Sequence, residues 1–235
     1  MPLDARPLLS AVLLAVQVFL PLSASAGMTP EEVKAFEGYK AKAESGDPVA
    51  QYNLGGCYDK GLGVARDKVE AVKWWRKAAD QGDAKAQDTL GYCYGSGFGV
   101  AKDDVQAMSW YRKAAEQGHA DAQYNLGNSY GSGFGVAKDD EQAMSWYRKA
   151  AEQGHAMAQL SLGFCYAKGV GVAKDEITAY AYLNLAAGGE APFARENLAI
   201  WEKRMSQNAL LLGQQRAKEL QKEIETKIAA KTAGK

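Results

Sequence analysis

Residues 94–120 read YGSGFGVAKDDVQAMSWYRKAAEQGHA, and residues 130–156 repeat them with one change, Val105 against Glu141. The two stretches lie 36 residues apart. A fixed period of about 20 to 50 residues is typical of stacked supersecondary units, so the sequence predicts an array and not one closed globule. The same frame gives four copies, at 47–82, 83–118, 119–154 and 155–190.

Each copy is expected to fold as two helices. In the first copy, Ala50, Leu54 and Tyr58 recur every four residues, and a second stripe runs from Ala71 to Ala78. Both stripes are close to the 3.6-residue period of an amphipathic helix. The array is therefore predicted to be all-α, with one antiparallel helix pair per copy.

The turn between the two helices carries its own signals. Gly61 and Gly63 tolerate the positive φ that ends a helix. Asp67, and its equivalents Asp103 and Asp139, precede a Glu or Gln by three residues, which favours an N-cap at the start of the second helix.

The positions that the copies share resemble Sel1-like repeats, which are relatives of the tetratricopeptide repeat. In the first copy these positions are Ala50-Gln51, Leu54-Gly55, Tyr58, Gly61-x-Gly63-Val64, Asp67, Ala71, Trp74-Trp75 and Lys77-Ala78-Ala79. The resemblance covers about residues 35–200 and is weakest in the fourth copy, where a Tyr-Ala-Tyr and Leu-Ala-Ala pattern replaces Trp-Tyr-Arg-Lys. It implies a right-handed α-solenoid that acts as a protein-binding adaptor.

The ends of the chain differ from the copies. Residues 1–26 contain Arg6, an apolar run at 8–22 and an Ala-Ser-Ala ending, which predicts a signal peptide cleaved after Ala26 and a periplasmic or secreted protein. The alternative is a membrane anchor, but the run is shorter than the roughly 20 residues that span a bilayer, so no membrane insertion is expected after cleavage.

Residues 27–46 match half a unit and are expected to cap the array, and residues 191–235 are expected to form capping helices with a frayed tail. Ser206 is the predicted N-cap of the last helix. The apolar residues of that helix are Leu210, Ala217, Leu220, Ile224 and Ile228. This stripe favours a helix that covers the end of the stack, with a dimerising coiled-coil seam as the alternative.

The charge balance argues against nucleic acid as a partner. The chain has 28 basic and 28 acidic residues, so its net charge gives no reason to expect a polyanion or an anionic membrane surface. The G-x-G turns lie between helices and not after a strand, which excludes a phosphate-binding loop and leaves no cofactor indicated.

The cysteine and histidine residues of the copies are expected to have structural roles and not catalytic or metal-binding ones. Cys57, Cys93 and Cys165 fill one position of the unit, and equivalent Cα atoms about 8 to 10 Å apart are beyond the roughly 7 Å reach of a disulfide, so free thiols are expected. His119 and His155 follow the closing glycines and are expected to be exposed in a first turn. With no third ligand nearby, neither a metal site nor a catalytic triad is predicted.

Variation among the copies indicates where binding would occur. The position of Tyr52 and the position four residues later change from copy to copy, while the packing positions hardly change. The resemblance places this side of the first helix on the concave surface. The candidate groove residues are Tyr52, Asp88, Tyr92, Tyr124, Asn128 and Phe164. Aromatic anchors among polar groups suit a bound peptide or protein segment.

Two other functions remain as alternatives. Certain cysteine-rich relatives have been associated with penicillin binding and weak β-lactam hydrolysis, but the S-x-x-K arrangement and the paired cysteines are missing here. The second alternative is a glycan or peptidoglycan binder that uses the same aromatic side chains. The preferred hypothesis is a non-enzymatic adaptor.

Overall fold

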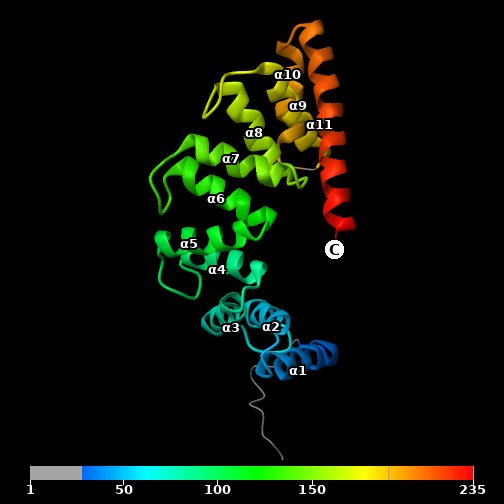
Figure 1. Cartoon of the computed structure of the whole chain (residues 1–235). Coiled ribbons are helices and arrows are strands. Elements are labelled where there is room, and N and C mark those ends of the chain that lie inside the picture. Colours follow the sequence, from blue (N-terminus) through cyan, green and yellow to red (C-terminus); the bar gives the residue numbers. More distant parts are fainter. Residues whose placement is uncertain (1–27, 190, 235) are drawn as a thin grey trace, which may run out of the picture.

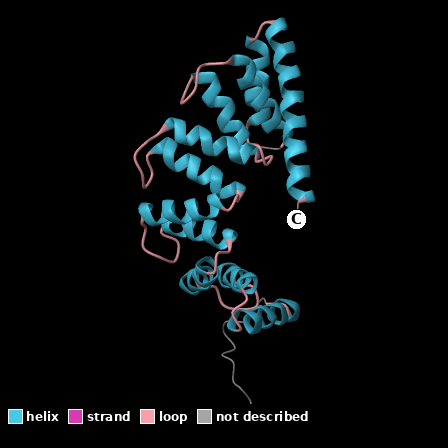
Figure 2. Cartoon of the chain, in the orientation of Figure 1, coloured by secondary structure: helices cyan, strands magenta, loops and turns pink. Residues whose placement is uncertain are grey.

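The computed structural model describes residues 28–189 and 191–234, in which eleven α-helices and no strand are found (Figures 1 and 2). The expected signal peptide and its cleavage point lie outside these residues. The helices are α1 (Pro30–Glu44), α2 (Pro48–Lys60), α3 (Lys68–Asp80), α4 (Ala84–Ser96), α5 (Asp104–Glu116), α6 (Ala120–Ser132), α7 (Asp140–Ala151), α8 (Ala156–Lys168), α9 (Glu176–Gly188), α10 (Ala194–Arg204) and α11 (Gln207–Ala233).

Four helix pairs stack along the molecule, as the period predicts. The pairs α2/α3, α4/α5, α6/α7 and α8/α9 pack internally and against the next pair, while α1 packs on α2 as the expected half-unit. Figure 1 shows the pairs arranged as a curved solenoid, so the predicted all-α solenoid is confirmed.

Asp side chains start the second helices and glycines end the first. Asp67 accepts hydrogen bonds from the backbone N–H groups of Val69 and Glu70, and Asp103, Asp139 and Asp175 cap their helices in the same way. Gly61 ends α2 with a φ of 74°. A side chain at Gly99, whose φ is 63°, would also overlap the carbonyl oxygen of Lys68, so this glycine allows one unit to rest on the previous one.

The core consists of one leucine per unit and the helix contacts around it. Leu54, Leu90, Leu126 and Leu162 are fully buried. The glycine after each leucine brings the two helices of a unit together: a Cβ atom added at Gly91 would lie 2.6 Å from Cδ1 of Tyr111. Close packing within each unit explains why the Leu-Gly pair hardly varies.

Buried glutamines join neighbouring units. Gln87 on α4 donates from Nε2 to the carbonyl oxygen of Ala79 on α3, and its Oε1 accepts from Nε2 of Gln117, the C-cap residue of α5. The pairs Gln51–Gln81 and Gln123–Gln153 repeat the arrangement. The fourth unit has Gly189 at the position of the second glutamine, which ends the series.

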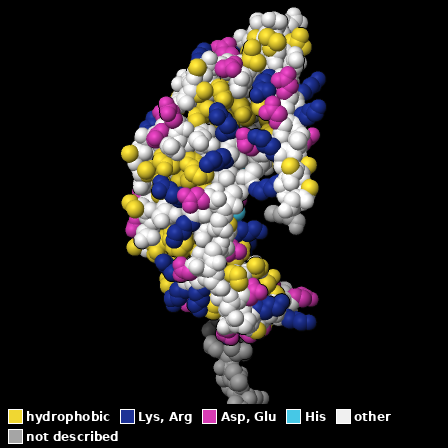
Figure 3. Space-filling model, viewed as in Figure 1, with side chains coloured by type: hydrophobic (Ala, Val, Ile, Leu, Met, Phe, Trp, Pro, Cys, Tyr) yellow, Lys and Arg dark blue, Asp and Glu magenta, His cyan; other side chains and the backbone are white. Residues whose placement is uncertain are grey.

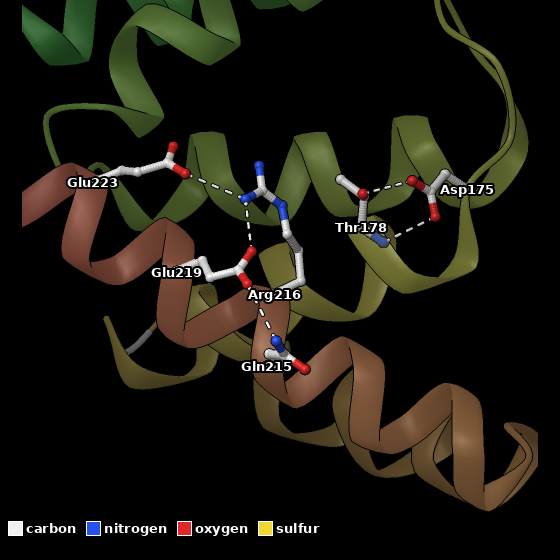
Figure 4. Close-up of polar contacts among 6 residues, drawn as sticks. All are labelled: Asp175, Thr178, Gln215, Arg216, Glu219 and Glu223. Carbon is white, nitrogen blue, oxygen red and sulfur yellow. Dashed lines mark hydrogen bonds and ion pairs between the residues drawn. The ribbon is translucent and has the colours of Figure 1, made fainter.

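The C-terminal helix covers the end of the stack. Ser206 caps α11 as predicted, and the helix packs its Ala217, Leu220 and Ile224 against α9. Residues 231–233, which were expected to fray, continue the helix. Figure 4 shows the half-buried Arg216 of α11 between Glu219 and Glu223, with nitrogen–oxygen distances of 3.1 and 3.2 Å.

In the part of the chain that the structure describes, no helix has both the length and the apolar character of a bilayer-spanning segment.

Candidate protein-binding groove

An open groove of about 580 Å³ lies between α2 and α4, and two of the candidate residues, Tyr52 and Tyr92, line it. We call it the α2–α4 groove. Its aromatic side chains are Tyr39, Tyr52, Trp75, Tyr92 and Phe98. Its polar side chains include Asn53, Thr89, Asp59, Lys60 and Arg66. The lining therefore combines aromatic surface with hydrogen-bonding groups.

The groove residues differ in how firmly they are held. Tyr92 is 58% exposed, whereas Tyr52 is half-buried against the core. Trp75 donates from Nε1 to the carbonyl oxygen of Tyr52 at 3.1 Å, and its ring centroid lies 6.2 Å from that of Phe98. The floor is thus fixed by packing, while Tyr92 presents an accessible aromatic ring.

Charged groups border the same groove. Arg66 Nη2 pairs with Asp59 Oδ1 at 3.3 Å. Lys60, at the end of α2, is exposed. An exposed pair of this kind contributes little stability, so both charges remain available to a ligand.

Asp88 belongs to a polar cluster between the second, third and fourth units. It accepts a 2.9 Å hydrogen bond from Nδ2 of Asn125, and its carboxylate lies with ligand atoms of His119 and Asp121 within 4.8 Å of one another. Burial raises the pKa of Asp88, although Asn125 and His119 oppose the rise. Asp88 therefore joins units and is only partly open to solvent.

The two histidines are N-caps and not exposed first-turn residues, so that expectation was wrong. His119 accepts the backbone N–H of Ala122 at Nδ1, and His155 accepts that of Ala158. The side chain of His155 is only 16% exposed because it stacks on Tyr124. An imidazole can replace the Asp of the first two units because Nδ1 is also an acceptor.

The hydrogen bonds that the histidine Nδ1 atoms accept determine which ring nitrogen could bind a metal. A neutral imidazole that accepts at Nδ1 carries its proton on Nε2. Nε2 of His155 then donates to Oδ1 of Asp121 at 3.1 Å. His119, the histidine of the cluster with Asp88 and Asp121, also accepts at Nδ1, so a metal would need the lone pair at its protonated Nε2, and the geometry suits hydrogen bonding better than metal coordination.

The other candidate residues lie outside the α2–α4 groove, and two of them, Asn128 and Tyr124, contact the same residue, Tyr147. Asn128 accepts a 2.8 Å hydrogen bond from the hydroxyl of Tyr147 and lines a second hollow, of about 460 Å³. Tyr124 lies between His155 and Tyr147. Phe164 packs against the C-terminal core. Of the six candidates, only Tyr52 and Tyr92 thus share one groove.

Some groove residues were not among the candidates. Tyr39 comes from the half-unit, and Phe98 is the middle residue of a G-x-G turn. The sequence did carry a signal for Phe98: its position reads Leu62, Phe98, Phe134 and Val170 along the array, which is apolar in every unit.

The three cysteines are free thiols. Cys57 and Cys93 are buried, and Cys165 is half-buried. Burial raises the pKa of Cys93 to about 12 and raises those of the other two thiols as well. Since the thiolate is the reactive form, these side chains are not activated as nucleophiles.

Comparison with known proteins identifies the repeat. The family model described as Sel1 repeat matches residues 48–83, 84–119, 120–155 and 156–188, so each match begins one residue after the corresponding copy defined by the period. No curated protein sequence matches the chain.

Two solved structures are similar over most of the chain. A protective antigen of uropathogenic Escherichia coli with an SLR fold is 38% identical, with a TM-score of 0.76; the alignment covers 86% of this chain and 44% of the antigen. A Sel1 repeat protein from Oxalobacter formigenes is 35% identical, with a TM-score of 0.70, and the alignment covers 82% of this chain and 76% of that protein. The chain thus spans less than half the length of the antigen.

Proposed function

Because the chain belongs to the Sel1 repeat family, we propose that it is a non-catalytic scaffold that binds a protein or peptide segment in the α2–α4 groove. Tyr92 carries the proposal: it is a large aromatic side chain, 58% exposed, beside an open groove whose floor is also aromatic. Exposed aromatic residues at concave sites are the usual anchors of protein interfaces.

The composition of the groove suits a polypeptide ligand. A tyrosine buries a large surface while losing few rotatable bonds, so it binds at low entropic cost. Asn53 and Thr89 can exchange hydrogen bonds with a peptide backbone, and Lys60 can meet a carboxylate. A segment with one apolar or aromatic side chain among polar neighbours would match this lining.

The state of the thiols supports a non-catalytic role. Cysteine would be the natural nucleophile of the chain, yet burial raises the pKa of Cys57, Cys93 and Cys165, which disfavours the thiolate.

The site of action is proposed to be outside the cytoplasm. The proposal rests on the sequence of residues 1–26, with its short apolar run and Ala-Ser-Ala ending. A mature protein that begins at Gly27, determined by intact-mass measurement after expression in a cell that exports it, would support export. An N-terminus that retains residues 1–26 would contradict it.

Replacement of Tyr92 tests the groove. In Tyr92→Ala, affinity for a partner that copurifies with the wild-type chain should fall at least about tenfold, which is the size of a hot-spot effect. Val105→Ala is the matched control, because Val105 is 68% exposed and lies on α5, outside the groove. Equal affinity of the Tyr92 variant and the wild type, with thermal unfolding unchanged, would refute the groove as the binding site.

A further inference from the structure

The turns that close the first three units share one chemical pattern. Each second helix ends in an acidic residue, a glutamine and a glycine, and we call these three residues a closing edge. The closing edges are 80–82, 116–118 and 152–154. The first two residues of each edge lie in the last turn of a second helix or directly after it.

The chain's own α11 docks on the third closing edge. Lys227 Nζ lies 2.8 Å from Oε1 of Glu152, and Lys231 Nζ donates to Oε1 of Gln153. Ile228, which lies between these lysines in sequence, rests beside Gly154. Two lysines four residues apart face the same way on a helix, so one helical face meets the acid, the amide and the glycine together.

A hydrogen bond within the third unit orients the amide for this contact. Gln153 donates from Nε2 to Oε1 of Gln123 at 2.8 Å, which leaves Oε1 of Gln153 as the acceptor for a lysine. The nearby Lys149 has its Nζ 3.6 Å from the ring centroid of Trp146. Glu152 is thereby left to pair with a cation from outside the unit.

The second closing edge has the same groups, and α11 approaches only its glycine, through Lys231. Glu116 and Gln117 are exposed. Gln117 again donates from Nε2 to a first-helix glutamine, at 2.7 Å, and Lys113 lies over Trp110, 3.8 Å from the ring centroid. Oε1 of Gln117 has no hydrogen-bond donor in the described part of the chain.

The first closing edge has the same geometry. Gln81 donates to Gln51 at 2.7 Å, and Lys77 lies over Trp74, 3.6 Å from the ring centroid. Asp80 is exposed. On two of the three closing edges, the acidic residue and the glutamine therefore have no partner from α11.

The end of α11 explains why these edges are uncovered. Lys231 approaches Gly118 of the second closing edge, and α11 ends two residues later at Ala233. Figure 1 shows α11 along the upper part of the solenoid, leaving the side of α2 to α5 free, and Figure 3 shows the surface hollowed beyond the end of this helix.

We propose that the closing edges of the first two units receive a helix of a partner protein that carries two lysines four residues apart with an apolar residue between them. This helix would continue the line of α11 along the solenoid. A different protein is favoured over a second copy, because Lys227 and Lys231 of each copy are already engaged with that copy's third edge. The surface is separate from the α2–α4 groove.

A peptide taken from α11 can serve as the probe. A fluorescein-labelled peptide of residues 217–234 is titrated with the whole chain, and binding is followed by fluorescence anisotropy at low and high salt. Asp80→Lys combined with Glu116→Lys should weaken binding about tenfold, because each change replaces attraction by repulsion. The same peptide with Lys227→Glu and Lys231→Glu should also lose binding, and salt should weaken the wild-type complex.

Two control variants make the result decisive. Glu141→Lys makes the same charge change as either single substitution of the double variant, at an exposed position outside the closing edges, and it should leave peptide affinity unchanged. Glu152→Lys alters only the edge that α11 occupies and should not reduce binding. Circular dichroism checks that each variant is folded.

Three results would overturn the proposal. The first is equal affinity of the wild type and the Asp80→Lys, Glu116→Lys variant. The second is loss of binding in Glu152→Lys alone, which would mean that the peptide merely exchanges with α11. The third is loss of binding in Tyr92→Ala, which would place the peptide in the α2–α4 groove and would leave the proposed function intact.

Discussion

Gln117, the C-cap residue of α5, donates a 2.7 Å hydrogen bond from Nε2 to Oε1 of Gln87 on α4, and Nε2 of Gln87 donates to the carbonyl oxygen of Ala79 on α3. Gln87 is 5% exposed. Three helices from two units are thus joined through one buried amide. A buried polar group held in this way stabilises a unique register between units, because any shift leaves a donor or an acceptor unsatisfied.

Gln87→Leu should therefore destabilise the protein. The side chain keeps a similar size, but the carbonyl oxygen of Ala79 and the amide of Gln117 lose their partner, at a cost of about 1–3 kcal/mol. Urea unfolding followed by circular dichroism measures the change. Gln106→Leu, at an exposed position, is the control and should stay within about 0.5 kcal/mol of the wild type. Equal stability of both variants would contradict the structural role of the relay.

A pair of glycine variants tests the packing within a unit. Gly91→Ala places a Cβ atom 2.6 Å from the Tyr111 ring, and it should destabilise the fold by about 1–3 kcal/mol through overpacking. Gly56→Ala, one residue after the equivalent glycine of the first unit, meets nothing within 4 Å and should be neutral or stabilising by up to about 1 kcal/mol. Thermal unfolding of the two variants separates them, and the reverse order of stability would show that the helices do not approach as described.

Asp88 gives a pH-dependent prediction. Burial raises its folded-state pKa above the unfolded value of about 3.9, despite the opposing effects of Asn125, His119 and His155. Between these two values the folded state binds more protons, so the contribution of Asp88 to stability falls as pH rises from about 4 through the raised pKa.

Asp88→Asn should remove this fall. An asparagine has no charge to bury, and its Oδ1 can still accept from Nδ2 of Asn125. Compared by urea unfolding at several pH values, the variant should be at least as stable as the wild type at pH 7 and should lose its relative advantage near pH 4. A variant that is less stable at pH 7 and equal at pH 4 would show that the charged carboxylate stabilises the cluster.

The thiol of Cys93 should be unreactive in the folded protein. Its pKa of about 12 leaves very little thiolate at pH 8, and the side chain is fully buried. A colorimetric disulfide reagent should therefore modify Cys93 at least about a hundredfold more slowly in the native protein than in denaturant. Modification at similar rates in both conditions would mean that the helices around Cys93 separate readily in the native protein.

The repeating part of the fold could be predicted from the sequence because the same local signals recur in register. The periodic stripe from Ala50 to Tyr58, the caps at Asp67 and its equivalents, and the turn glycines all indicate the same helix pair. Agreement among independent local signals is what makes such a prediction dependable.

The features that were not predicted depend on side-chain orientation or on residues distant in sequence. The caps formed by His119 and His155 depend on which ring nitrogen faces the backbone, and the relay through Gln87 depends on a partner thirty positions away. The sequence also did not predict where α11 packs, because an apolar stripe does not specify which helix it covers.

The candidate site was predicted less well than the fold. Variation between copies located positions whose side chains differ from unit to unit, but it could not distinguish open surface from contacts within or between units. Tyr92 is open, whereas Asp88 bonds to Asn125 and Tyr124 stacks on His155. The neighbouring unit decides the difference.

Site-specific photo-crosslinking tests the central claim most directly. A benzophenone-bearing amino acid is placed at position 92 in the α2–α4 groove or at position 105 on α5, and the cells that produce the protein are irradiated before crosslinked peptides are identified by mass spectrometry. We expect one polypeptide partner to crosslink from position 92 and not from position 105. Equal crosslinking from both positions, or crosslinking from position 105 alone, would contradict binding in this groove.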